Sequence, residues 1–555
     1  MKHEFTPKLW TVLREERLTR AQLLKDVSSG VTVGIVALPL AIAFAIASGV
    51  EPGQGLITAI VAGFIISALG GSRVQIGGPT GAFVIIVYGI IRDFGLTGLT
   101  IATLMAGVMM IAFGFLRLGN YLKYIPYPLI VGFTSGIAVL IFTTQLNDLF
   151  GLGMAEVPAE FFAKWKAYGA HFSHIHFPTL AIALFTMGVT LLVPRLLPRV
   201  PGSIIAIILS TLAVAVFNLP VETIQDRFGD FSASFVFPRL AGQITGDNLV
   251  RLLQPALAVA LLGSIESLLS AVVADGMIGS RHRSNMELVA QGTANIFSAL
   301  LGGIPATGAL ARTVTNIKNG GRTPISGMVH AVTLLLILLI LKPLAGLIPL
   351  SSLSGIMVIV AYNMSEWRQF RSLLKSNGVD VMILLVTFFL TVIFDLIIAI
   401  EVGLVLSSFL FMKRMGDSLS IQKTSVKAEE DWSGDDDLSD MREVPPPSTD
   451  LMVYEVNGPL FFAAAGEFQD LITHGRDTPS TVIIRMRYVP FIDATGYQRL
   501  KTILSRFKER HVRVILTGVS PELKKDFSRH GVFSIIPEED VYGDFREALA
   551  SLGRG

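Results

Sequence analysis

Long apolar runs alternate with short polar connections from Asp26 to Phe411. A helix that crosses a membrane needs about 20 mostly apolar residues, or fewer if the helix is interrupted. On this criterion the pattern predicts a polytopic α-helical membrane protein with fourteen spans. The predicted spans cover residues 27–48, 55–70, 79–92, 97–116, 125–150, 178–194, 201–218, 254–275, 285–301, 306–317, 325–348, 352–363, 379–397 and 399–412.

The connections between the predicted spans differ in charge. Lysines and arginines such as Arg73 and Arg117 follow the even-numbered spans, whereas the short connections after odd-numbered spans contain almost none. Positively charged connections stay on the cytoplasmic side of a membrane protein. We therefore expect both ends of the chain to be cytoplasmic.

Composition supports a membrane region followed by a soluble one. Hydrophobic residues make up 51% of the 555 residues and charged residues only 16%, where soluble proteins contain roughly 25% charged residues. We expect a cytosolic segment at 1–25, a transmembrane region at 26–412, a linker at 413–450 and a soluble domain at 451–555. The net charge of +2 gives no reason to expect nucleic acid as a partner. The absence of cysteine excludes disulfides and thiol chemistry.

The tail has the pattern of a small α/β domain. Residues 424–450 are acidic and contain three consecutive prolines, which is typical of a solvated linker. Beyond them, apolar runs of strand length alternate with amphipathic helical segments. The expected strands are 451–456, 481–486 and 513–517, and the expected helices are 496–509, 521–530 and 541–552.

One turn of the tail carries residues with two alternative roles. Asp493 and Thr495 lie between a predicted strand and a predicted helix. Either side chain could cap the start of that helix. A hydroxyl at this position could instead be phosphorylated or sense a ligand. Asp493 and Thr495 are therefore candidate regulatory residues.

Two Gly- and Pro-rich segments interrupt the apolar pattern and are similar to each other. Gly77–Ala82 opens the third predicted span, and Gly302–Ala309 opens the tenth. Their offset of seven spans places one copy upside down relative to the other, as in an inverted repeat. Each helix start offers unpaired N–H groups and the positive end of a dipole, so two facing starts would attract an anion. Ordinary tight turns between spans are the alternative explanation.

Charged residues inside the apolar region are further candidates. Glu266 lies within the eighth predicted span, where a buried carboxylate is costly and points to a function. Ser270 is one helical turn further on, so the two could hold a sodium ion, or Glu266 could carry a proton. Arg312 lies near the start of the tenth span. It could add positive potential to an anion site, pair with Glu266, or reach an interface.

No motif predicts a cofactor or a metal site. The loop from His171 to His176 contains three histidines, which could bind a metal, but an ordinary polar loop is the simpler explanation. The chain contains no nucleophile–base arrangement, no Walker loop and no Rossmann fingerprint. We therefore expect no enzymatic activity, and any transport would have to be driven by gradients.

Taken together, these motifs resemble the SulP/SLC26 family of anion transporters with a C-terminal STAS domain. The resemblance extends over nearly the whole chain and rests on residues 38–44, 78–80, 263–267, 291–295, 302–316 and 493–496. It implies a 7+7 inverted repeat of fourteen spans, a core domain that moves against a gate domain, and a homodimer.

The resemblance also implies a binding site and a mechanism. The anion would lie between the starts of the third and tenth spans, and Glu266 and Ser270 would handle the coupling ion. The implied anion-binding residues are Phe44, Thr80, Gly81, Gly308, Ala309, Leu310 and Arg312. Sodium-coupled members carry aspartate at the position of Glu266, which favours proton coupling here. The implied activity is sulfate permease-like secondary active transport by alternating access in a bacterial inner membrane, with the STAS domain open to a cytosolic partner.

Several alternatives stay open at this point. Within the family, residues 363–366 and 458–465 are most similar to proteobacterial members, including a proton-dependent C4-dicarboxylate carrier. Bicarbonate and succinate are therefore alternative substrates, coupled to protons or to sodium. An uncoupled anion channel or a carrier of neutral solutes could share the same architecture.

Overall fold

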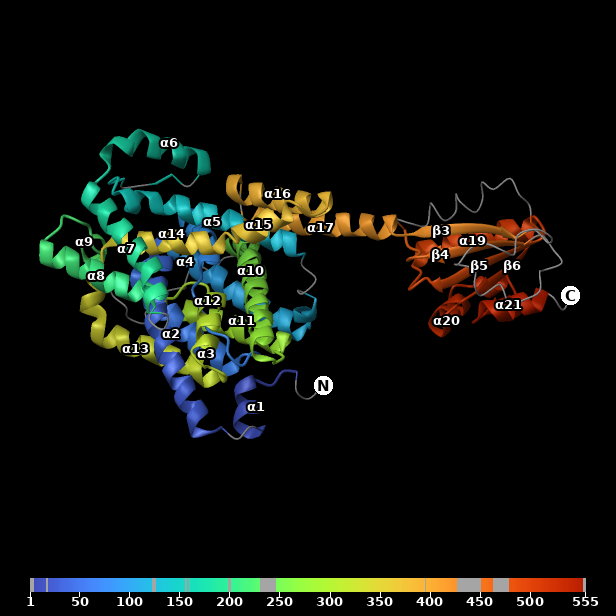
Figure 1. The fold of residues 1–555 in the computed structure, drawn as a ribbon, viewed down its shortest axis with the longest axis horizontal. Coiled ribbons are helices and arrows are strands. Elements are labelled where there is room, and N and C mark those ends of the chain that lie inside the picture. Colours follow the sequence, from blue (N-terminus) through green and yellow to red (C-terminus); the bar gives the residue numbers. More distant parts are fainter. Residues whose placement is uncertain are drawn as a thin grey trace. The chain divides into compact units, whose positions relative to one another are not determined.

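The chain folds into two compact units, Met1–Leu404 and Val405–Gly555. Figure 1 shows a helical bundle in the first unit and a sheet flanked by helices in the second. The computed structural model describes residues 4–15, 18–121, 126–154, 157–158, 160–197, 201–229, 246–394, 396–426, 451–462 and 479–552.

The first unit begins with a short amphipathic helix and continues with long apolar ones. Its first half contains α1 (Lys8–Glu15), α2 (Arg20–Ala47), α3 (Pro52–Leu69), β1 (Gly77–Gly78), α4 (Gly81–Phe115), η1 (Leu118–Asn120), α5 (Tyr127–Phe150), α6 (Phe161–His171), η3 (Phe172–His174), α7 (Phe177–Leu196), α8 (Gly202–Phe217) and α9 (Ile224–Phe228). Its second half contains α10 (Gly246–Ile278), α11 (Ser284–Leu300), β2 (Thr307–Gly308), α12 (Leu310–Lys318), α13 (Pro324–Gly346), α14 (Leu350–Met364), α15 (Trp367–Leu373) and α16 (Gly378–Ile393). The unit boundary falls within α17 (Leu396–Asp417).

Each of the fourteen predicted spans coincides with a helix or with half of one. In the described part of the chain, six helices are long and apolar enough to cross a membrane: α2, α3, α4, α5, α7 and α10. The long α4 contains two predicted spans, because Gly95 has a φ of 68° that interrupts the helix. The half-helices α4 and α12 begin at Gly81 and Leu310, later than the predicted 79 and 306, because the residues before them are extended.

The spans pack in two groups. One consists of α2, α3, α4 and α10–α13, and the other of α5, α7, α8, α14 and α16. In the first group α4 crosses α11 closely, since a methyl group at Gly107 would lie 2.7 Å from the carbonyl oxygen of Gly292. Small residues permit such close packing of membrane helices. The two groups agree with the core and gate domains that the resemblance implied.

The start of the chain requires a correction. Residues 1–25 do not form a separate segment, because α2 already begins at Arg20, where the hydroxyl of Thr19 caps it. The preceding α1 is tied to the bundle by a hydrogen bond of 2.9 Å from the backbone N–H of Lys8 to the carbonyl oxygen of Gly70. Hydropathy did not reveal α1 because it is short and carries several charges.

The second unit is a five-stranded sheet with helices on both faces. Its elements are β3 (Ser420–Val426), β4 (Leu451–Asn457), β5 (Thr481–Tyr488), α19 (Ala494–Glu509), β6 (Arg513–Thr517), α20 (Pro521–Arg529), η5 (Val532–Ser534), η6 (Glu538–Asp540), β7 (Val541–Tyr542) and α21 (Phe545–Leu552). The strand order is β3-β4-β5-β6-β7, and only the β3–β4 pair is antiparallel. Val482 packs with Leu500 of α19 on one face, and Ile483 packs with Phe545 of α21 on the other. Burial on both faces explains the continuous apolar strands.

The expected linker at 413–450 also requires a correction. Helix α17 continues to Asp417, and β3 then pairs along β4 from Ser420 opposite Asn457 to Val426 opposite Leu451. The sequence of β3 is mostly polar, which is typical of an edge strand and hid it among linker residues. Residues 427–450 lie outside the described part of the chain. The predicted helix at 541–552 divides into β7 and α21.

Candidate functional site

The two Gly- and Pro-rich segments lie side by side. Strands β1 and β2 pair antiparallel, with Gly77 opposite Gly308 and Gly78 opposite Thr307. The pairing joins segments that are far apart in the sequence and carry the same motif. They therefore meet, as the inverted-repeat interpretation requires.

Helices α4 and α12 begin directly after this ladder. Thr80 is the N-cap residue of α4 and Ala309 that of α12, and among the described residues neither side chain caps its helix. The N–H groups of the first turns thus lack the acceptor that a capped helix provides. Together with the positive ends of two dipoles, they offer an environment suited to a negative ion.

Polar side chains of α10 and α11 hold the β2 segment in its extended form. Thr307 donates its hydroxyl to the carbonyl oxygen of Gly263 at 2.9 Å, and the hydroxyl of Ser267 lies 2.7 Å from the hydroxyl of Thr307. Asn295 binds both the N–H and the carbonyl oxygen of Ala306, each at 2.8 Å. The sequence prediction assigned no role to Ser267, Thr307 or Asn295. A sequence pattern could have identified them. Ser267 and Asn295 are polar residues within apolar helices, and Thr307 lies next to a Gly-rich break in the apolar pattern.

Two charged residues contact successive residues of the loop before α4. Thr80 donates its hydroxyl to Oε2 of Glu266 at 3.0 Å, and Arg312 donates from Nη2 to the carbonyl oxygen of Pro79 at 3.1 Å. Glu266 is half-buried, and Arg312 is 3% exposed. Nη1 of Arg312 is buried with no hydrogen-bond partner in the described residues. The sequence analysis considered a direct ion pair between Glu266 and Arg312. In the structure each of these side chains instead contacts the loop before α4.

Ser270 makes a different contact from the one its spacing predicted. Its buried hydroxyl donates to the hydroxyl of Thr313 on α12, at 3.4 Å. Thr313 in turn accepts a hydrogen bond of 3.0 Å from the backbone N–H of Ile76. Ser270 therefore ties α10 to the start of α12, and an ion held between Ser270 and Glu266 would have to replace this bond.

Gly81 lies where the two helix groups meet. A methyl group at Gly81 would lie 2.7 Å from Sδ of Met364 on α14 and 3.3 Å from the ring of Phe44 on α2. Phe44 and Ala309 are each 6% exposed, whereas Leu310 is 39% exposed. The structure thus brings the predicted residues from α2, α4 and α12 to one place. It adds Met364, which the sequence prediction did not include among the site residues.

In the second unit, Asp493 caps α19. Its Oδ1 accepts from the N–H of Gly496 at 2.7 Å, and its Oδ2 accepts from the N–H of Phe462 at 3.1 Å. Thr495 follows on the first turn and is half-buried. The capping role proposed from the sequence therefore fits Asp493.

The described histidines of the loop before α7 have separate partners. Nδ1 of His171 lies 3.0 Å from the carbonyl oxygen of Ala167, and Nδ1 of His176 lies 2.7 Å from the hydroxyl of Thr179. Over the ranges that the structure covers, no three His, Asp or Glu side chains are grouped to hold a metal ion.

Known proteins resemble this chain along most of its length. YvdB of Bacillus subtilis, which is named as a sulfate transporter, is 41% identical over 93% of this chain and 96% of its own length. The bicarbonate transporter BicA of Picosynechococcus is 30% identical over 94% of each chain.

Solved structures share the fold. The transmembrane domain of a cyanobacterial BicA superposes with a TM-score of 0.63 at 33% identity, covering 69% of this chain and 99% of that one. The murine anion transporter Slc26a9 superposes with a TM-score of 0.86 at 17% identity, covering 99% of this chain and 94% of that one.

The family assignment follows from matches to both units. Residues 23–387 match the sulfate permease family, and residues 443–548 match the STAS domain. The members of this family are transporters and not enzymes. The chain therefore belongs to the sulfate permease (SulP/SLC26) family of membrane anion transporters and carries a C-terminal STAS domain.

Proposed function

We propose that this protein is a secondary active transporter that binds its anion between the starts of α4 and α12 and moves it by alternating access. The observation that carries the proposal is the β1–β2 ladder, which sets two uncapped helix starts next to each other. Sulfate is the first candidate substrate. Backbone N–H groups recognise negative charge and size, so they suit a compact oxyanion.

The proposed binding residues are those predicted from the sequence. A methyl group at Gly308 would overlap the amide of Gln75, and one at Gly81 would lie 2.7 Å from Sδ of Met364, so glycine lets these side chains pack directly on the loop backbone. Phe44 and Leu310 form apolar walls. The buried guanidinium of Arg312 supports the positive potential from behind the loop, since it binds Pro79 and not a carboxylate. The full proposed set is Phe44, Thr80, Gly81, Gly308, Ala309, Leu310 and Arg312.

Glu266 is the proposed coupling residue. Its carboxylate accepts a hydrogen bond from Thr80, the N-cap residue of α4. A negative charge so close to the helix start opposes anion binding, and a proton on Glu266 removes that charge. Proton binding and anion binding would then favour each other, which is the condition for symport. Sodium near Glu266 and Ser270 is the alternative coupling ion.

Alternating access would use the two helix groups. Gly81 belongs to the first group and Met364 to the second, and they meet next to the proposed anion site. Sliding of one group against the other would expose the site to each side of the membrane in turn. We further propose a homodimer in a bacterial inner membrane, with both termini cytoplasmic and the STAS domain binding a cytosolic partner.

Bicarbonate is a second candidate substrate. The observation that favours it is the identity of 33% to the transmembrane domain of BicA, a bicarbonate transporter. The site proposed here contains few side chains that would separate one small anion from another. A C4-dicarboxylate such as succinate is a third candidate and would need a longer cavity.

Uptake by the purified full-length protein in proteoliposomes tests the proposal. Labelled sulfate, bicarbonate and succinate are compared with and without an inward proton or sodium gradient, and protein-free liposomes are the control. We expect one anion to accumulate above its external concentration only when protons are supplied. Equilibration without accumulation would indicate an uncoupled channel, and uptake unaffected by excess inorganic anions would indicate a carrier of neutral solutes.

A further inference from the structure

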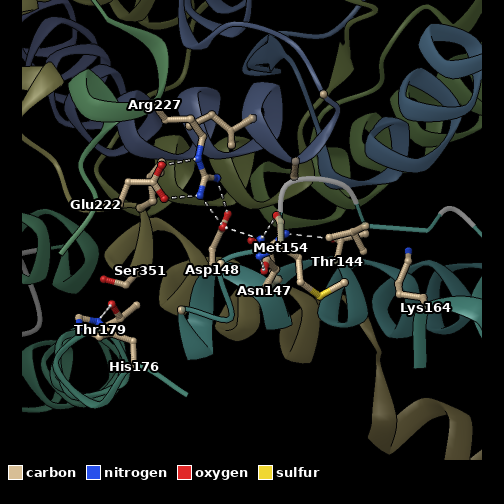
Figure 2. Close-up of a pocket in the computed structure, with 18 of the residues that line it drawn as sticks. Thr144, Asn147, Asp148, Met154, Lys164, His176, Thr179, Glu222, Arg227 and Ser351 are labelled. Atoms are coloured by element: carbon tan, nitrogen blue, oxygen red, sulfur yellow. Dashed lines mark hydrogen bonds and ion pairs between the residues drawn. The ribbon is translucent and has the colours of Figure 1, made fainter. Parts of the chain in front are cut away.

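A large cavity lies apart from the proposed anion site. It has a volume of about 1160 Å³ and is lined by the last residues of α2 and α5 and by the starts of α7 and α14. Figure 2 shows the polar side chains that line it. None of the residues proposed above to bind the anion or the coupling ion is among its lining residues.

Helix α2 connects the cavity to the proposed anion site. Phe44 contacts the site near Gly81, and Ile46, two residues further along α2, lines the cavity. The cavity lies at the end of α2 opposite to its N-terminal residue Arg20. In the proposed orientation this is the outer side of the membrane, so an anion would pass through the cavity on its way between the outside and the site.

Two arginines of the cavity are already paired with carboxylates. Arg227 lies 3.0 Å from a carboxylate oxygen of Asp148 and also binds Glu222, and Figure 2 shows it between the two. Arg92 pairs with its neighbour Asp93 at 2.7 Å. Arg92 and Asp93 cancel each other, whereas Arg227 offsets only one of its two carboxylates, so the cluster of Arg227, Asp148 and Glu222 keeps a formal charge of −1.

Lys164 on α6 differs from the two arginines. Its side chain lines the cavity but is only 5% exposed, and no carboxylate in the described residues pairs with it. Burial lowers the pKa of its ammonium group to about 8. A buried charge is costly unless a counter-charge compensates for it. Lys166, two residues further along the same helix, is exposed, so its charge carries no such burial cost.

Neutral polar side chains of α5 line the same cavity. Thr144, Gln145 and Asn147 of α5 line it with hydroxyl and amide groups. In Figure 2, Lys164 is drawn apart from the pair of Asp148 and Arg227, whereas Thr144 lies one helical turn before Asp148 on α5. An ammonium group in a cavity that neutral polar groups also line is suited to bind a partly hydrated anion and repels cations.

We propose that this outer cavity is a second anion-binding site, in which Lys164 and the polar side chains of α5 collect the small oxyanion or carboxylate that the protein transports. The identity of the anion at this second site depends on the proposed function. The attraction itself depends only on the cavity and its lysine, so it can be measured without transport.

A single introduced thiol measures that attraction. The chain contains no cysteine, so Thr144→Cys places one reactive group inside the cavity. The full-length variant in detergent is treated with a sulfonate-bearing methanethiosulfonate and with an uncharged one of similar size. The ratio of the two modification rates reports the electrostatic potential near position 144. Lys164→Gln, Lys164→Arg and the matched control Lys166→Gln are then added to the Thr144→Cys background.

With Lys164 present we expect the anionic reagent to be favoured by roughly tenfold, the lower end of the gain that a charged cleft provides. Lys164→Gln should remove this preference, whereas Lys164→Arg and Lys166→Gln should keep it. Added sulfate should slow the anionic reagent only where position 164 is basic. An unchanged ratio in Lys164→Gln, or an equal loss in Lys166→Gln, would overturn the proposal. Met154→Cys, which also lines the cavity, replaces Thr144→Cys if that variant does not fold.

Transport kinetics give a second and separate readout. Lys164→Gln should raise the KM for the transported anion several-fold at low ionic strength and leave kcat nearly unchanged, because capture and not translocation is affected. If no anion is transported but the thiol ratio depends on Lys164, the cavity site stands and the proposed function fails. If anions are transported and neither KM nor the thiol ratio depends on Lys164, the cavity site fails and the proposed function stands.

Discussion

The hydroxyl of Thr80 donates a hydrogen bond to the carboxylate of Glu266, with the two oxygens 3.0 Å apart. Thr80 is also the N-cap residue of α4, one of the two helix starts that meet at the β1–β2 ladder. A single residue therefore connects a carboxylate within the membrane region to a helix start suited to an anion. Such a contact can couple two binding events, because a charge change at Glu266 acts directly on the proposed anion site.

Removal of the Thr80 hydroxyl tests this contact. Thr80→Val has nearly the same shape but leaves the carboxylate of Glu266 without its donor, at a cost of about 1–3 kcal/mol. The charged form of Glu266 then loses its stabilisation, so proton-dependent uptake should extend to higher pH. Thr80→Ser keeps the donor and should behave like the unmodified protein. A pH profile of uptake that is the same for both variants would contradict the coupling role of this hydrogen bond.

Replacement of Glu266 should separate binding from accumulation. Glu266→Gln keeps an acceptor for Thr80 but cannot release a proton. We expect the anion to equilibrate across the proteoliposome membrane with an accumulation ratio of about 1, because an uncoupled carrier favours neither side. Glu401→Gln, at an exposed position of α17, is the matched control. Normal accumulation in Glu266→Gln, with an unchanged elution profile in gel filtration, would disprove the coupling role.

Arg312 can be disturbed without being replaced. Gly78 has a φ of 154°, and a methyl group there would overlap Nη1 of Arg312. Gly78→Ala should therefore displace the guanidinium and weaken anion binding as Arg312→Ala does, by roughly tenfold or more for a charge-assisted hydrogen bond worth about 1.5–3 kcal/mol. The measurement is the KM for uptake. Gly89→Ala, at a position with open space around it, is the control and should have no effect.

The outer cavity should lose its anion preference in alkaline solution. The pKa of Lys164 is lowered by burial to about 8, so the ammonium is charged below this pH and neutral above it. In Thr144→Cys, the ratio of anionic to neutral thiol modification should fall between about pH 7 and about pH 9. The other ionisable groups that line the cavity are Tyr88, Arg92, Asp148, His176, Glu222 and Arg227. In Thr144→Cys with Lys164→Gln, the ratio should not change with pH. A ratio that still falls in this variant would assign the titration to one of these other groups.

Truncation should show where the STAS domain begins. A chain that ends at Asp417 removes the whole sheet, whereas one that ends at Thr424 leaves most of β3 without its partner β4. An unpaired strand promotes aggregation. We expect the shorter chain to stay monodisperse and keep its order of anion preference, with a changed rate, and the longer one to aggregate in gel filtration. Similar behaviour of both would count against β3 as part of the domain.

Many of the main features could be predicted from the sequence. Apolar runs predict the spans because hydrophobic length reports directly on membrane thickness. The repeated glycines and prolines at 77–82 and 302–309 predict two helix starts, because backbone geometry restricts which residues break a helix. Glu266 stood out because a carboxylate is rare in such surroundings. These properties are local, and local properties can be read from a sequence.

Which polar side chains bind one another was decided by the tertiary structure. The spacing of Ser270 and Glu266 suggested a shared ion, yet Ser270 binds Thr313, and Glu266 binds Thr80. Met364 and the buried Lys164 were not predicted as site residues, because hydropathy cannot distinguish a residue that faces a neighbouring helix or a cavity from one that faces lipid or water. The sequence by itself determined which segments cross the membrane and where they break. Only the packing of distant segments decided which polar groups meet, since each such contact depends on two positions that no local pattern connects.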